Sequence, residues 1–408
     1  MSGFGTQPDV RFKILQQLLF LVTVCVFSVG HTQAQDSTLT RLIRRNQHPL
    51  TLNGTQFSGT GWAKLQQEVL KSQVVLIGED HGIAEIPLFT TAIAKEFKPT
   101  LFIAEIDAYQ AQDLSRLAGQ PGLPLVFQKK HPMALSFYSW TEEFELARYL
   151  RSRNVELLGI DQVNAFSTGR FYSLLAEKSK DKAVKSYFSR RAIAYQANDR
   201  AAFGADLSQI TILRQSSATL DSLVALTKKE SPEVQRMVND YVASARIYQT
   251  QSHQPRVNLM KRNVGMRLSG SQPLPKTLLK LGANHAARGV SLVSGVFDVG
   301  NLVLNLADAH DQKSLHILIA GKQGKKLSGF NLDDFSKNIA SYSNTDEVFV
   351  KPFPVPTGST AWQVFDMRPI RRALLNEKLK LDNLKLITVI MGYDYVVIIP
   401  ETTASRNF

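Results

Sequence analysis

The sequence predicts an α/β fold with a mainly parallel central sheet flanked by helices and a large helical insertion. Short, continuous apolar runs that end in glycine or acidic residues indicate strands buried on both faces. The clearest run is VVLIGEDHG, which spans residues 74–82. Strands that alternate with helices at the observed spacing are typical of βαβ units, which build parallel sheets covered by helices.

The remaining strands and helices are predicted from continuous apolar runs and from apolar residues at helical spacing, respectively. Further strands are predicted over residues 101–104, 155–160, 277–281, 315–319, 384–391 and 395–399. Helices are predicted over residues 62–71, 83–97, 108–117 and 141–153, where apolar residues recur at helical spacing. From 171 to about 248 the pattern is helical and contains no strand. We therefore predict a helical insertion over about 168–268, which either covers the ligand edge of the sheet or forms a separate helical domain.

Length and composition indicate a globular protein with a sizeable core. The chain has 408 residues, of which 44% are hydrophobic and 20% are charged, and these values are ordinary for a folded protein. The formal net charge is +13, yet the lysines and arginines are scattered and match no nucleic-acid-binding motif. We predict a basic, solvated surface and no nucleic-acid partner.

The N-terminus has the three parts of a secretory signal peptide. Arg11 and Lys13 precede an apolar run over residues 18–29, and the small residues Thr32 and Ala34 follow as a cleavage site. We predict a signal peptide over 1–35 and an exported protein, periplasmic or extracellular, with an uncleaved anchor as the alternative. A lead-in would then span 36–60, and a single domain would span 61–408.

The predicted mature chain contains neither cysteine nor a second membrane-length segment. The only cysteine, Cys25, lies inside the predicted signal peptide. Cleavage of the predicted signal peptide would remove Cys25, so the mature chain could have no disulfide, no catalytic cysteine and no cysteine-ligated zinc site. No later stretch is long and apolar enough to cross a bilayer, so no integral membrane segment is expected after signal cleavage.

Ionisable residues stand at the carboxyl ends of four predicted strands. Glu79 and His81 follow the first strand, Glu105 the second, Asp161 the third, and His285 a later one. Because parallel strands bring these ends to one edge of the sheet, we expect the five side chains to lie together. Two imidazoles and three carboxylates can support general acid–base chemistry or bind a metal. The alternative is that each residue caps a helix or ends a solvated loop.

Several segments, taken in order, resemble the erythromycin esterase family, whose superfamily includes ChaN-like haem-uptake and TIKI/TraB-type proteins. The segments are GEDHG at 78–82 with Glu85 downstream, IAEID at 103–107, the helix at 139–154 with GIDQ at 159–162, PRVNLMKRN at 255–263, GANHAARG at 282–289, and the closing strand GYDYVVIIPETTAS at 392–405. Together they cover most of the chain after residue 60.

The resemblance implies roles for particular residues. His81 matches the general base that activates a water, and Glu79 and Glu105 match the acidic residues that orient and tune it. His285 matches the second histidine of the site, and Arg256 matches an arginine on an inward-facing helix. The predicted binding residues are Glu85, Asp161 and Asn284. The implied reaction is hydrolysis of an ester or lactone in a small-molecule substrate.

The motifs also bear on the nucleophile and on metals. No serine lies in a G-x-S-x-G turn, which favours water as the nucleophile. No H-E-x-x-H motif is present, so we predict no cofactor and no metal ligands, although a divalent metal at the His/Glu site is chemically possible. One residue separates Glu79 from His81, a spacing that resembles the haem-uptake branch. A ligand-binding protein without turnover and a metal-dependent TIKI-type hydrolase therefore remain as alternatives.

The other histidines are predicted to lie outside the site. His31 and His48 precede the predicted domain. We expect a second group to occupy loops or the surface, namely His131, His253, His310 and His316.

Overall fold

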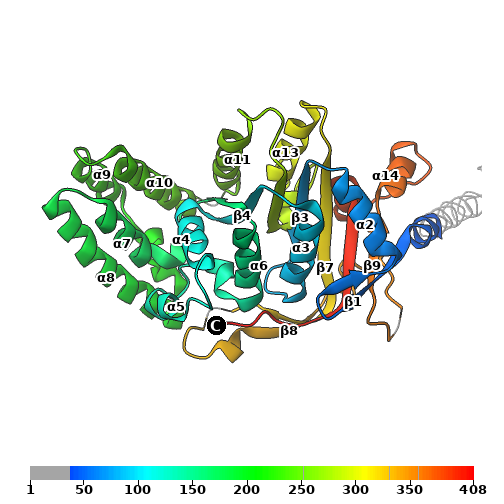
Figure 1. The fold of residues 1–408 in the computed structure, drawn as a ribbon, viewed down its shortest axis with the longest axis horizontal. Coiled ribbons are helices and arrows are strands. Elements are labelled where there is room, and N and C mark those ends of the chain that lie inside the picture. Colours follow the sequence, from blue (N-terminus) through cyan, green and yellow to red (C-terminus); the bar gives the residue numbers. More distant parts are fainter. Residues whose placement is uncertain (1–36, 251, 330, 357) are drawn as a thin grey trace, which may run out of the picture.

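The structure, a computed structural model, describes residues 37–250, 252–329, 331–356 and 358–408 (Figure 1). Within these residues the predicted α/β class is confirmed, because helices flank a central, mostly parallel sheet. The predicted signal peptide over residues 1–35 lies outside the described residues. No helix in the described part of the chain is long and apolar enough to cross a membrane.

Ten strands form the sheet in the described part of the chain, in the order β2-β1-β9-β10-β7-β3-β6-β4-β5, with β8 paired to β7. The strands are β1 (Gln47–Asn53), β2 (Gln56–Ser58), β3 (Val74–Glu79), β4 (Leu101–Asp107), β5 (Glu156–Asp161), β6 (Thr277–Gly282), β7 (Ser314–Leu327), β8 (Ile339–Ser343), β9 (Trp362–Asp366) and β10 (Tyr395–Thr402). The run from β10 to β5 is parallel throughout, and antiparallel pairs join β1, β2, β8 and β9 to it.

Helices cover both faces of this sheet (Figure 1). One face carries α2 (Thr60–Leu70), α3 (Glu85–Phe97), α4 (Ala108–Ala118) and α6 (Thr141–Ser152). The other carries α11 (Gln254–Leu268), α12 (Ala283–Ala286), α13 (Val299–Asp308), α14 (Arg368–Leu375) and α15 (Leu384–Gly392). Val75 and Ile77 of β3 pack on the first layer, whereas Val74 and Leu76 pack on the second. Burial on both sides explains why the strand is continuously apolar.

The predicted helical insertion contains two kinds of helix. Four of its helices share a core of their own at one end of the sheet (Figure 1), and they are α7 (Thr168–Lys178), α8 (Lys182–Ala205), α9 (Ser217–Leu226) and α10 (Pro232–Gln249). Tyr109 of α4 reaches into this core and donates a 2.6 Å hydrogen bond to Asp240. In contrast, α11 packs on the sheet through Met260 and Val264.

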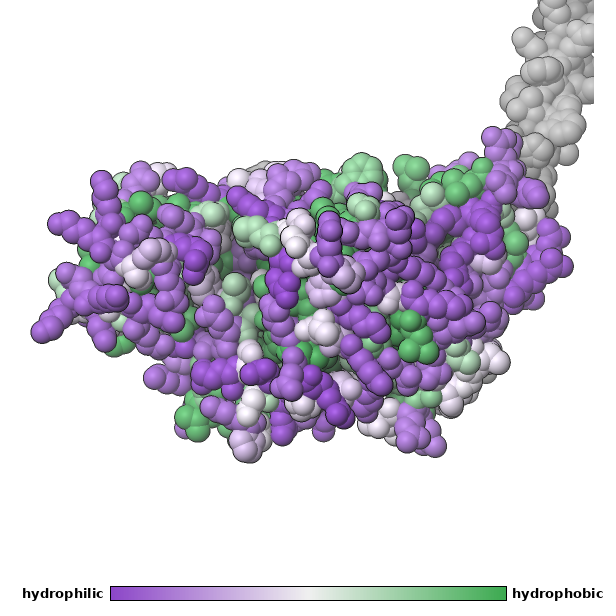
Figure 2. All heavy atoms as spheres, turned by 45° about the horizontal axis from the view of Figure 1, so that its top comes forward, coloured by the Kyte–Doolittle hydropathy of each residue, from purple (hydrophilic) through white to green (hydrophobic). Residues whose placement is uncertain are grey.

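Residues 37–45 form a further helix before β1, and the remaining elements are short. They are α5 (Leu125–Lys130) and the 3-10 helices η1 (Ser136–Ser139), η2 (Ala165–Ser167), η3 (Leu207–Gln209), η4 (Thr211–Arg214) and η5 (Phe335–Asn338). Hydrophilic residues cover most of the face that Figure 2 presents, with smaller apolar areas between them.

One predicted strand is wrong, and the lead-in differs from expectation. Residues 384–391 form helix α15, which the Asn383 side chain caps by accepting a 3.1 Å bond from the Leu386 backbone N–H. Its buried residues Leu386, Val389 and Ile390 follow helical spacing, so tertiary packing overrides the strand preference of this apolar run. The predicted lead-in supplies β1, which pairs with β9, so the sheet begins before residue 61.

Candidate active site

The site begins with a histidine that is held by a buried carboxylate. Glu79 and His81 lie two residues apart at the end of β3, so both side chains point to the same side. The Nδ1 atom of His81 lies 2.8 Å from Oε1 of Glu79. When Nδ1 carries the proton and donates it to Glu79, the lone pair of neutral His81 is on Nε2. Nε2 faces the second carboxylate of the site, at 3.8 Å from Oε2 of Glu105.

A buried lysine sits behind this pair. Nζ of Lys280, on the neighbouring strand β6, lies 2.5 Å from Oε1 of Glu79 and 2.6 Å from Oε1 of Glu143. All three side chains are 3% exposed. Burial raises the pKa of Glu143 to about 7, and the nearby Glu79 carboxylate adds to this rise. Oε2 of Glu143 has no hydrogen-bond partner among the described residues.

The environment raises the basicity of His81. Burial lowers the pKa of His81. Its hydrogen bond to Glu79 and the charges of Glu79 and Glu105 outweigh this effect, so the net pKa is above the usual 6.5. Lys280 opposes this rise. The ring stacks on Phe137, with centroids 4.2 Å apart and planes 15° apart. His81 is thus fixed on three sides and remains 30% exposed.

Glu105 and Asp161 hold the arginine of α11. Nη2 of Arg256 lies 2.8 Å from Oε1 of Glu105. The guanidinium also binds Asp161 through two bonds, Nε to Oδ1 at 2.9 Å and Nη2 to Oδ2 at 2.5 Å. Glu105 accepts a further 2.6 Å bond from the backbone N–H of Gly282. Although burial alone would raise the pKa of Glu105, the neighbouring side chains of His285, His81 and Arg256 hold it well below the usual value.

His285 joins the same network from α12, next to β6. Its Nε2 lies 3.4 Å from Oε1 of Glu105, and its Nδ1 lies 2.9 Å from Oδ2 of Asp298. Burial lowers the pKa of His285, but the two carboxylates outweigh that effect and raise it to about 10. His285 therefore carries a positive charge at neutral pH.

The structure brings together six of the eight predicted site residues, and they are Glu79, His81, Glu105, Asp161, Arg256 and His285. Glu85 instead bonds the backbone N–H and the hydroxyl of Thr403, which anchors the C-terminal segment. Asn284 accepts bonds from the backbone N–H groups of Val293 and Ser294 and donates to the Ser294 hydroxyl. These two side chains thus have structural partners and do not line the cleft described below.

A cleft of about 820 Å³ opens in front of the site. Four of the predicted residues line it, namely His81, Glu105, Asp161 and Arg256. Its other walls include aromatic side chains from η1 and the residue after it, from η2, from η5 and from the C-terminus, namely Phe137, Trp140, Phe166, Phe335 and Phe408. The cleft therefore pairs apolar walls with a small, charged floor, as small-molecule sites do.

Sequence reasoning missed several residues that complete the site. Lys280 is a lone charge inside the apolar strand TLLKLG, a signal that a buried partner must exist. His253 was predicted to lie in a loop or on the surface, but its ring lies 5.2 Å from that of His285. Asp298 sits in a segment without a recognisable motif, so no local pattern identifies it.

One other prediction for a histidine was wrong. His316 is fully buried on β7, where its Nδ1 lies 2.8 Å from the carbonyl oxygen of Ala286. His131 lies in a loop after α5, as predicted, but it is buried, at 6% exposure. Burial lowers the pKa of each imidazole to about 4, so both are neutral at pH 7. The prediction that His48 precedes the domain also differs from the structure, because His48 pairs with Val364 of β9.

Comparison with known proteins supports the fold. No family model matches the chain, and no curated protein matches its sequence. Among solved structures, a mutant of the erythromycin esterase EreC in its open conformation aligns over 84% of this chain and 94% of its own, with 15% identity and a TM-score of 0.52.

Two further structures match over most of their length. A succinoglycan biosynthesis protein and a protein from Bacillus cereus each align over 91% of this chain and 99% of their own, with TM-scores of 0.56 and identities of 14% and 16%. The chain therefore has an erythromycin esterase-like fold, as the sequence resemblance implied.

Proposed function

We propose that this protein is an exported hydrolase that cleaves an ester or lactone in a small molecule, with water activated by His81. The observation that carries the proposal is the Glu79–His81 pair, which leaves Nε2 on the floor of a cleft. A histidine whose Nδ1 is held by a carboxylate is a suitable general base.

In the proposed reaction, neutral His81 takes a proton from water at Nε2 while the water oxygen bonds to the substrate carbonyl carbon. The carbonyl π electrons move to oxygen, and the resulting oxyanion is stabilised by positive charge on the cleft floor, where Arg256 lies. Collapse of this intermediate breaks the bond to the leaving alkoxide, which takes the proton back from His81. The step needs no bound metal or other cofactor.

A second candidate is a ligand-binding protein without turnover. One observation favours it: aromatic side chains line the cleft over a small charged floor, which suits the binding of a ligand whether or not turnover follows. The two candidates differ in their response to pH, because the hydrolase gains activity as His81 loses its proton.

The test is a screen of purified protein against aryl esters and lactones of graded size at several pH values. We expect turnover that His81→Gln lowers about 100-fold or more, while the variant keeps the parent far-ultraviolet circular dichroism. His310→Gln is the matched control, since His310 lies outside the site. Absence of turnover across the screen, with saturable binding of apolar ligands in the cleft, would favour the binding protein.

Export is tested separately. We expect mass spectrometry of the protein recovered from the periplasm or medium to show a chain that begins near Gln35 or Asp36. A chain with an intact residue 1 would contradict signal cleavage.

A further inference from the structure

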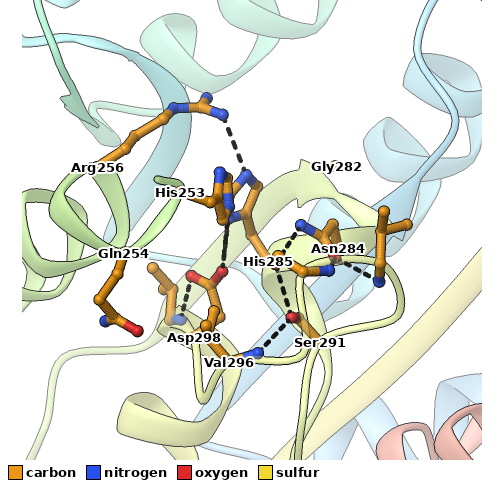
Figure 3. Close-up of polar contacts among 12 residues, drawn as sticks. His253, Gln254, Arg256, Gly282, Asn284, His285, Ser291, Val296 and Asp298 are labelled. Carbon is orange, nitrogen blue, oxygen red and sulfur yellow. Dashed lines mark hydrogen bonds and ion pairs between the residues drawn. The ribbon is translucent and has the colours of Figure 1, made fainter. Parts of the chain in front are cut away.

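Three potential metal ligands meet beside the candidate active site (Figure 3). They come from the residue before α11, from α12, and from the residue before α13, and they are His253, His285 and Asp298. One ligand atom from each lies within 4.8 Å of the other two. In Figure 3 the two imidazole rings lie together above the carboxylate, with Arg256 on the far side of His285.

The distances suit a single ion. Nδ1 of His285 lies 2.9 Å and Nε2 of His253 lies 3.9 Å from Oδ2 of Asp298. Ligand atoms in a tetrahedral site, each bonded at about 2.1 Å, are separated by about 3.4 Å. The observed separations fall on either side of this value. Small side-chain movements and release of the Nδ1 proton of His285, which a metal ion displaces on binding, would complete the site. Two imidazoles and one carboxylate leave a fourth position for water.

An independent observation points to a missing ligand. Nε2 of His253 is buried and has no hydrogen-bond partner within the described ranges, although it lies on the side facing Asp298. Buried polar atoms are nearly always satisfied, so an atom without a partner calls for an ion, a water or another donor. A metal ion would provide that partner.

The surroundings orient the ligands as they do in metal sites. Oδ1 of Asp298 accepts a 2.7 Å bond from the backbone N–H of Val299, which leaves Oδ2 for the two imidazoles. Glu105 lies 3.4 Å from Nε2 of His285, on the opposite side of the ring from Asp298. A carboxylate that accepts from the outer nitrogen of a metal-bound imidazole is a common arrangement, and it fixes the ring orientation.

We propose that His253, His285 and Asp298 bind one divalent transition-metal ion of the zinc class. The ion links the starts of α11 and α13 to α12, and none of its three ligands lines the cleft. Because Arg256 follows His253 by three residues, the ion also fixes the helix start that carries this arginine. The site shares His285 with the candidate active site, where His285 and His81 both contact Glu105, and a binding measurement tests the metal site without any substrate.

The test titrates chelator-treated, dialysed protein with Zn²⁺ by calorimetry and with Co²⁺ by visible absorption. We expect one equivalent of each to bind, visible bands typical of four-coordinate cobalt, and a higher melting temperature with Zn²⁺. His253→Gln should weaken binding at least about tenfold, and it suits the test because His253 is 29% exposed.

His310→Gln is the control for adventitious binding by surface histidines. We expect it to bind as the parent does. The proposal is overturned if the parent binds no equivalent of either metal, or if His253→Gln binds both as tightly as the parent. Circular dichroism of His253→Gln confirms that any loss reflects the ligand and not the fold.

Discussion

A methyl group added at Gly282 tests whether Nε2 of His81 is the atom that activates water. A Cβ atom built on this residue would lie 3.1 Å from Nε2 of His81 and 3.2 Å from Oε2 of Glu105. The residue has φ −52° and ψ 142°, which alanine adopts without strain. Gly282→Ala therefore keeps the backbone, including the N–H that binds Glu105, and fills the space next to the proposed base.

The size of the effect follows from the loss of access. If the methyl excludes water from Nε2, general-base catalysis is lost, and the rate should fall about 100-fold, equivalent to about 2.7 kcal/mol of activation free energy. The free energy of unfolding should fall by roughly 1–3 kcal/mol, because His81 and Glu105 are held by other partners and must shift by a few tenths of an ångström to admit the methyl group.

The assay is steady-state hydrolysis of the best substrate from the screen, together with urea unfolding. Gly289→Ala is the matched control, since no atom lies within 4 Å of its added Cβ, and we expect it to retain the parent rate. If Gly282→Ala hydrolyses the substrate as fast as Gly289→Ala, Nε2 of His81 is not the atom that activates water.

Three other predictions concern charge. The midpoint of the pH–rate profile should lie above pH 6.5, because activity requires His81 to lose its proton and Glu79 and Glu105 raise its pKa more than Lys280 lowers it. Glu79→Gln should move this midpoint to lower pH, and an unchanged midpoint would contradict the assignment. Lys280→Met should cost about 3–5 kcal/mol in urea unfolding by removing the buried cation that Glu79 and Glu143 share, unlike the exposed control Lys378→Met. Unfolded His316 binds a proton below about pH 6.5, whereas the folded residue does so only near pH 4. As the pH falls from 6.5 to 4, the free energy of unfolding should therefore decrease by up to about 3 kcal/mol, and urea unfolding of His316→Gln should show a smaller decrease.

The parallel part of the fold is readable from the sequence because each strand there is buried on both faces. Such strands appear as unbroken apolar runs, as in β3 and β6. The strands β1 and β8 escape prediction because burial alternates along them and exposed positions interrupt the apolar pattern. Helix α15 is mistaken for a strand because a short apolar run of this composition is typical of both buried strands and buried helices. Only its packing in the folded protein distinguishes the two.

Strand ends predict the core of the site for a similar reason. A parallel sheet places every carboxyl end at one edge, so Glu79, Glu105, Asp161 and His285 could be grouped without knowing any contact. Asp298 and His253 could not be grouped this way. They flank helices rather than follow strands, and their proximity to His285 depends on how α11 and α13 pack.

The charge balance of the site explains why its two histidines differ. His285 faces Glu105 and Asp298 with little exposure, so its pKa of about 10 keeps it cationic. His81 shares Glu79 with Lys280, and the lysine charge limits how far that carboxylate can raise the basicity of the imidazole. A carboxylate serving His81 alone would hold its proton more tightly. Lys280 therefore makes the imidazole of His81 less basic than an unopposed Glu79–His81 pair would be.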